Sequence, residues 1–151
     1  MRLTNNEQRS LILEVVHPSQ LPDAKPIRVF LTGPAGCGKT FTINLLKETY
    51  NRLYTSPGSA SNAYVAMETT GKAGSAIGGV TVHSALKITM KKDDVGLRHS
   101  DLNTYRCAFR DVRAIFVDEV SMMGSEVLVK VDERLRQITQ NFHESFGGLD
   151  V

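Results

Sequence analysis

The feature that most constrains this chain is a glycine-rich segment between an apolar run and an amphipathic run. Residues 33–40 read GPAGCGKT and match the pattern G-x-x-x-x-G-K-[ST] at each fixed position. The run at 27–31 predicts a buried strand, and 41–53 predicts a helix. The apolar face of that helix is expected to consist of Phe41, Leu45 and Leu46.

This spacing favours binding of a polyphosphate. Glycines let backbone N–H groups turn inward around an anion, and the helix that follows directs its positive end at the same point. We expect Lys39 to neutralise β- and γ-phosphate charge and the Thr40 hydroxyl to ligate Mg²⁺. The alternative, a glycine-rich turn that binds nothing, fits the flanking strand and helix poorly. The predicted nucleotide-binding residues are Gly33, Pro34, Ala35, Gly36, Cys37, Gly38, Lys39 and Thr40.

An acidic pair follows a second apolar run, at 114–117. Nucleotide hydrolysis needs a carboxylate at the end of a neighbouring strand, to hold Mg²⁺ and to orient the attacking water. We assign Asp118 to the Mg²⁺ shell and Glu119 to the role of general base. The alternative is a helix cap or a solvated acidic pair, which the intact phosphate loop disfavours.

The order of predicted elements indicates a three-layer α/β domain with a mainly parallel sheet. Its length of 151 residues suits one domain, with 1–26 as an N-terminal helix and linker and 27–151 as the core. Strands are predicted at 27–31, 64–67 and 114–117. Helices are predicted at 7–16, 41–53, 72–77, 102–112 and 126–140, with a short one within 80–88. The apolar stripe of the last long helix is expected at Leu128, Val131, Leu135 and Ile138.

Composition excludes few classes of protein. The formal net charge is +2, so nucleic-acid contact would depend on the local placement of basic residues. The two cysteines, Cys37 and Cys107, are interpreted as free thiols. The sequence contains no apolar run long enough for a membrane span and no secretory signal, which predicts an intracellular protein without membrane partners.

Several segments together resemble one family of motor proteins. Residues 118–123 read DEVSMM, residues 70–73 read TGKA, and residues 78–86 read GGVTVHSAL. With LTNNEQ at 3–8, they resemble the motifs of Pif-one-like DNA helicases of superfamily one B. DERLRQ at 132–137 and FGGLDV at 146–151 are most similar to helicases of Helitron-type transposons.

The resemblance implies a RecA-like fold and ATP-driven 5′-to-3′ unwinding in DNA repair, recombination and telomere maintenance. It implies that Gln8 reads the adenine, and that Thr70, Gly71 and Lys72 contact the backbone of single-stranded DNA. His83 falls at the family's histidine, which implies that it contacts DNA or supports the loop. The alternatives are an exposed glutamine at a helix start, a solvated lysine and a packed structural histidine. Nuclear location is expected, with the mitochondrion as the alternative.

The chain departs from the family pattern at two positions. Thr69 stands where proline is usual, and Gly74 stands where alanine is common. Proline fixes φ and glycine does not, so both departures are expected to loosen this turn. We expect them to affect DNA affinity and to leave the ATP site untouched.

The family's motor also has a further strand and a second RecA-like domain that supplies arginines. An arginine finger is typically worth about 10³–10⁵ in rate, so these 151 residues alone are expected to bind ATP, hydrolyse it slowly and unwind nothing. Two other readings are a transposon-derived ATP-binding module without turnover and a different ATPase, such as an AAA-type machine. Gln8 and the DEVSM segment disfavour the last of these.

Overall fold

The computed structural model describes residues 4–19, 24–71, 77–89 and 96–151. Its longer helices are α1 (Asn6–Ser19), α2 (Lys39–Tyr54), α4 (His99–Phe109) and α5 (Ser125–Thr139), and a short one is α3 (Val82–Leu86). The strands are β1 (Tyr64–Glu68), β2 (Val80–Thr81) and β3 (Ala114–Asp118). Two 3₁₀ turns, η1 (Val120–Met122) and η2 (Ser145–Gly148), complete the order.

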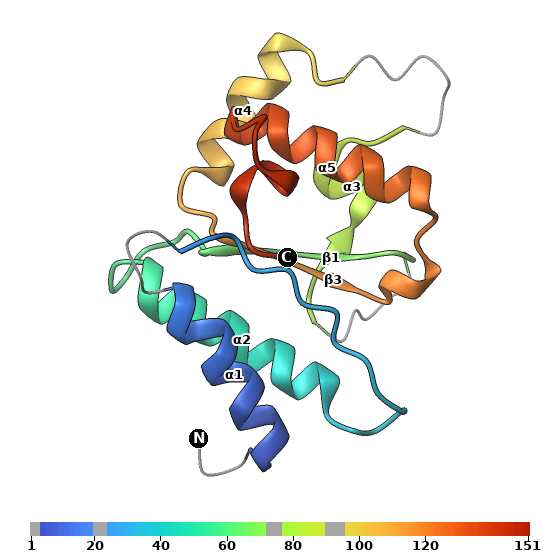
Figure 1. Ribbon diagram of the computed structural model, residues 1–151. Coiled ribbons are helices and arrows are strands. Elements are labelled where there is room, and N and C mark those ends of the chain that lie inside the picture. The colour runs from blue at the N-terminus through green and yellow to red at the C-terminus, as the bar shows by residue number, and fades with distance from the viewer. Residues whose placement is uncertain (1–3, 20–23, 72–76, 90–95) are drawn as a thin grey trace.

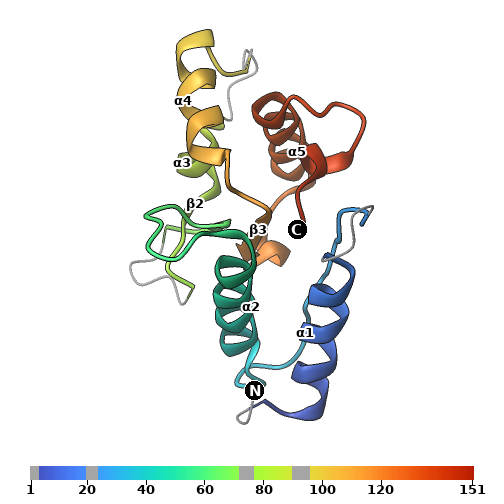
Figure 2. The ribbon, with the colours of Figure 1, turned by 90° about the vertical axis from the view of Figure 1, so that its left-hand side faces the viewer.

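The three strands form a parallel sheet in the order β2-β1-β3. Helices α1 and α2 lie on one face, and α3, α4 and α5 lie on the other (Figures 1 and 2). The predicted three-layer α/β fold with a parallel sheet is therefore confirmed. Gly79 permits the close approach of β2, because a Cβ there would lie only 2.7 Å from the carbonyl oxygen of Ala66.

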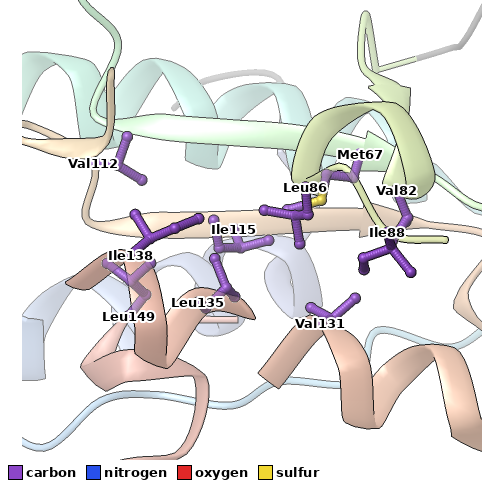
Figure 3. Close-up of a cluster of buried hydrophobic side chains, with 10 residues drawn as sticks. All are labelled: Met67, Val82, Leu86, Ile88, Val112, Ile115, Val131, Leu135, Ile138 and Leu149. Atoms are coloured by element: carbon purple, nitrogen blue, oxygen red, sulfur yellow. The ribbon is translucent and has the colours of Figure 1, made fainter. Parts of the chain in front are cut away.

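Alternation along the strands divides the apolar side chains between two cores. Ile115 and Met67 face the α5 side, where they form the α5 core cluster, whereas Ala114 faces the α2 side and joins the α2 core cluster. Figure 3 shows the α5 core cluster between the sheet and α5. Its members are Met67, Val82, Leu86, Ile88, Val112, Ile115, Val131, Leu135, Ile138 and Leu149. The α2 core cluster consists of Ile12, Val15, Leu46, Tyr50, Ala63 and Ala114.

The buried strand predicted at 27–31 is only partly formed, and its burial is wrong for Val29 and Phe30, which are 42% and 70% exposed. The N–H of Val151 donates to the carbonyl of Ile27 at 2.9 Å, and the N–H of Val29 donates to the carbonyl of Val151 at 2.8 Å. This alternation is that of a parallel pair, and Asp150 bridges Ala114 in β3 on the other side. A ladder needs a neighbour along its whole length, and in the described chain the pairing partner of this segment is Val151 alone, so 30–32 is extended without a regular ladder.

Two predicted apolar stripes need correction. In α2 the buried residues are Thr42, Leu46 and Tyr50, and Phe41 is 44% exposed. In α5 Leu128 is 38% exposed, and the buried stripe starts instead from the half-buried Val127. The physical reason is the same in both helices, since the face that packs is set by where the sheet lies and not by apolarity alone.

The predicted boundaries hold with small shifts. Helix α1 runs to Ser19 rather than ending at residue 16, and α4 begins at His99 rather than 102. The helix predicted at 72–77 falls largely outside the described residues. Both cysteines are free and exposed, as predicted. In the described part of the chain, each helix is too short or too polar to span a lipid bilayer.

The two leucines of α5 provide a direct test of this packing. Leu135 is fully buried, so Leu135→Ala is expected to lower the free energy of unfolding by about 2–5 kcal/mol. Leu128→Ala, in the same helix, should change it by only about 0.5 kcal/mol, because Leu128 is 38% exposed and lies outside the α5 core cluster. Urea unfolding followed by circular dichroism measures both. Equal losses for the two variants would contradict the packing described.

Candidate nucleotide-binding site

The glycine-rich loop contains positive φ angles, which glycine adopts without steric cost. Gly36 has φ +78° and Gly38 has φ +90°, a region that side-chain-bearing residues rarely adopt. Gly38 is the N-cap of α2, so the helix starts directly at Lys39. The predicted arrangement, a tight loop opening into a helix N-terminus, is present.

Lys39 is held across its own loop. Its Nζ donates to the carbonyl oxygens of Gly33 at 2.7 Å and Pro34 at 2.9 Å. These bonds orient the ammonium group at the mouth of the loop, where positive charge favours an anion. Its third contact is with Sγ of Cys37 at 3.9 Å, a weak acceptor that a phosphate oxygen would replace.

The acidic pair lies where β3 ends. The N–H of Glu119 donates to Oδ1 of Asp118 at 2.9 Å, which orients that carboxylate. Glu119 has φ 53° and ψ 38°, a left-handed conformation that turns the chain sharply into η1. Asp118 is half-buried and Glu119 is exposed.

One cavity of about 420 Å³ joins the loop to the acidic pair, and its size falls in the usual range for small-ligand pockets. Gly33, Lys39, Asp118 and Glu119 all line it. The glycine-rich loop and the acidic pair, which are far apart in sequence, therefore meet at the polar end of this cavity. The remaining walls are mainly apolar and come from 27–31, α1, α2, β3 and Val151.

The floor of this cavity depends on residues that local patterns do not reveal. Asp150 accepts a hydrogen bond from the N–H of Ile27 at 2.8 Å and another from the hydroxyl of Tyr50 at 2.7 Å. Burial and then the charge of Asp150 raise the pKa of Tyr50 far above its usual value, so the phenol stays protonated and donates. Asp150 therefore ties the segment before the loop to α2. Only its long-range partners distinguish this aspartate from a surface one.

Gln8 lies beside the loop and also caps a helix. Its Oε1 accepts from the N–H of Asn5 at 3.1 Å, and Asn5 Oδ1 accepts from the N–H of Gln8 at 2.8 Å. This reciprocal pair is a capping box at the start of α1. A Cβ on Gly38 would lie 2.5 Å from Nε2 of Gln8, so the amide touches the loop. Reading of adenine by Gln8 stays a prediction.

The oxygen donors present fit a magnesium ion. Mg²⁺ prefers carboxylate, hydroxyl and phosphate oxygens and usually retains waters rather than occupying an all-protein cage. Asp118 supplies a carboxylate inside the cavity, whereas Thr40 is an exposed residue in the first turn of α2 and does not line the cavity. Among the described residues no group of three or more His, Cys, Asp or Glu side chains gathers to form an all-protein metal site, here or elsewhere.

Three of the four residues predicted to contact DNA are described. The sheet register pairs Glu68 with both Asp118 and Thr81, so the carboxyl ends of the strands share one edge. Thr70 and Gly71 follow β1 at that edge, and His83 lies half-buried in α3 just after β2. Lys72 lies outside the described residues. The structure thus brings the predicted DNA segment and the acidic pair to the same edge.

Thr69, one of the two departures from the family pattern, contacts the acidic pair, a link that the sequence did not predict. Its hydroxyl oxygen lies 3.0 Å from the carbonyl oxygen of Glu119 and 3.2 Å from that of Asp118. The contact arises because β1 and β3 end in register. A threonine after a strand carries no local signal of such a partner.

A parallel sheet covered by helices on both faces, with a phosphate loop and an acidic strand end sharing a cavity, defines a RecA-like nucleotide-binding domain of the P-loop class. The profile of the PIF1-like helicase family matches residues 3–151. The chain therefore belongs to the PIF1-like helicase family.

Curated relatives support this assignment. The chain is 32% identical over 126 residues to the ATP-dependent DNA helicase PIF1 of Saccharomyces cerevisiae, which covers 82% of this chain and 14% of that protein. It is 32% identical over 130 residues to the yeast ATP-dependent DNA helicase RRM3, covering 84% of this chain and 17% of that one. The chain therefore spans a small part of the length of these relatives.

Solved structures show the same fold. Unliganded Pif1 from Bacteroides aligns with a TM-score of 0.70 and 25% identity, covering 99% of this chain and 30% of that chain. A double mutant of the Bacteroides helicase aligns with a TM-score of 0.72 and 27% identity, covering all of this chain and 32% of the other.

Proposed function

We propose that this chain forms the ATP-binding and ATP-hydrolysing part of an ATP-dependent DNA helicase. The observation that carries the proposal is the shared cavity, which is lined both by Lys39 of the loop and by the Asp118–Glu119 pair. A glycine-rich turn or a solvated acidic pair would not require these segments to meet. Membership of the family and the names of the curated relatives supply the DNA-helicase part of the proposal.

Each residue type has a defined task in this proposal. Backbone N–H groups of 35–38 and the Lys39 ammonium hold the β- and γ-phosphates, whose negative charge they offset. Asp118 and Thr40 hold Mg²⁺, which neutralises charge developing on the phosphates. Glu119 accepts a proton from the attacking water as general base.

Single-stranded DNA is the second proposed ligand, bound at the carboxyl edge of the sheet. Thr70 and Gly71 offer hydroxyl and N–H donors there, which suit sequence-independent contact with phosphates, and His83 lies beside them. Lys72 belongs to the same proposal through the family motif. The finer proposals are 5′-to-3′ movement, service in DNA repair, recombination and telomere maintenance, action with a second RecA-like domain, and a nuclear location.

Steady-state ATP hydrolysis with and without single-stranded DNA tests this function. We expect turnover that rises when DNA is added, in keeping with the names of the curated relatives, which are ATP-dependent DNA helicases. Magnesium should be required, and EDTA should stop the reaction.

The second candidate, an ATP-binding module without turnover, shares every motif and gives a different outcome. Nucleotide binding with no hydrolysis, in the presence of both DNA and magnesium, would favour it. Absence of both binding and hydrolysis in correctly folded protein would reject the nucleotide site itself.

A further inference from the structure

The Thr69 hydroxyl connects the two ligand-binding segments of the sheet edge. Thr69 directly precedes Thr70, the first residue of the proposed DNA segment, and follows the last residue of β1. Its Oγ1 lies 3.0 Å from the carbonyl oxygen of Glu119 and 3.2 Å from that of Asp118. A hydroxyl has one hydrogen to donate, so the two carbonyls share it.

Glu119 needs such support because its backbone conformation is uncommon for a residue with a side chain. Its φ of 53° and ψ of 38° lie in the left-handed region, which persists where surrounding contacts hold it. Within its own turn, the N–H of Glu119 donates to Asp118 and its carbonyl accepts from the N–H of Met122 at 2.9 Å. The hydrogen bond from Thr69 comes instead from the residue that follows β1.

The position of this bond has a mechanical consequence. The side chain of Glu119 and the carbonyl that Thr69 binds belong to the same residue. A shift of residue 69 is therefore expected to move the Glu119 carboxylate. Thr70 is joined to Thr69 by a single peptide bond, and its hydroxyl is the group proposed to contact single-stranded DNA. A displacement of the segment at 70–71 therefore reaches Glu119 through one hydrogen bond.

We propose that Thr69 is a positioning residue that couples the DNA segment at 70–71 to the general base Glu119. The inference rests on the proposed function. It adds to it a physical route by which DNA binding changes the rate of ATP hydrolysis. Thr69 itself is placed in contact with neither ligand, so its loss should alter turnover and coupling while leaving nucleotide affinity unchanged.

The test compares three variants by calorimetric ATP affinity, ATP turnover and the stimulation of turnover by single-stranded DNA. Thr69→Val keeps the branched shape and removes the hydroxyl, and Thr69→Ser keeps the hydroxyl. Thr104→Val is the matched control, because Oγ1 of Thr104 also donates to a carbonyl, that of Ser100 at 3.3 Å, on the exposed helix α4.

Thr69→Val should bind ATP like the parent protein but turn it over about tenfold more slowly or worse, since small misplacements of a reacting group are costly. It should also lose most of the stimulation by DNA, while Thr69→Ser keeps it and Thr104→Val changes nothing. A purely structural bond would instead lower stability and leave turnover of the folded protein unaltered.

Parental turnover and stimulation in folded Thr69→Val, or failure of Thr69→Ser to retain them, would overturn the inference. If Thr69→Val does not fold, Thr69→Ser against Thr69→Ala makes the same comparison without the branched carbon. A parent protein that binds no ATP would instead reject the proposed function. If the parent protein hydrolyses ATP and Thr69→Val has the same turnover and the same stimulation by DNA, only the coupling is rejected.

Discussion

Lys39→Ala is expected to weaken ATP binding by roughly 10- to 100-fold, because charge-assisted hydrogen bonds contribute about 1.5–3 kcal/mol and each 1.4 kcal/mol is tenfold. The ammonium group lies at the loop mouth, bonded to the carbonyls of Gly33 and Pro34. Its removal takes away the positive charge and also leaves those two carbonyls pointing toward the phosphate position. Binding loss should therefore exceed that of a simple charge deletion.

Isothermal titration calorimetry with ATP and magnesium measures this effect. Lys25→Ala is a suitable control, because Lys25 is exposed and does not line the cavity. The far-ultraviolet circular dichroism of both variants should match that of the parent protein. Unchanged affinity in folded Lys39→Ala would remove Lys39 from the nucleotide site and weaken the whole assignment.

Glu119→Gln is expected to leave ATP binding nearly intact and to slow hydrolysis by roughly 10²–10⁴, the usual contribution of a general base. Glutamine has the same shape but a far weaker basic group. The hydrogen bonds that hold this turn use only the backbone N–H and carbonyl of Glu119, so the substitution preserves them. Binding and chemistry should therefore separate in this variant.

Single-turnover hydrolysis together with calorimetry distinguishes these two effects. Glu126→Gln, an exposed glutamate in the first turn of α5, is the matched control. If Glu119→Gln abolished binding, the side chain would have a structural role, and another group would have to act as the base.

The structure also shows why some predictions held and others did not. The strands at 64–67 and 114–117 were predicted because continuous apolar runs between turns indicate burial on both faces. The apolar stripes at Phe41 and Leu128 were wrong, because helical periodicity gives a face but not the position of the sheet beneath it. The strand at 27–31 was predicted from apolarity alone, whereas its regularity depends on a partner strand.

Roles assigned by family motif stay predictions, and the structure adds contacts that the motifs do not reveal. Gln8 does lie against the loop, yet it also forms a capping box with Asn5, which a motif match does not reveal. Thr69 was interpreted only as a looser turn. Its hydrogen bonds to the Asp118 and Glu119 carbonyls depend on the register of β1 and β3, which no local pattern encodes.

Sequence by itself determined the local chemistry of this protein. Glycines at 36 and 38 permit the loop, Lys39 supplies the cation, and Asp118 with Glu119 ends an apolar strand, all within short segments whose conformations follow from residue type. Only the tertiary structure decided that these segments share a cavity, that Asp150 and Tyr50 close its floor, and that Thr69 touches the acidic pair. The reason is physical, because such contacts join residues far apart in the chain, and their geometry depends on how strands pair and helices pack across the whole domain.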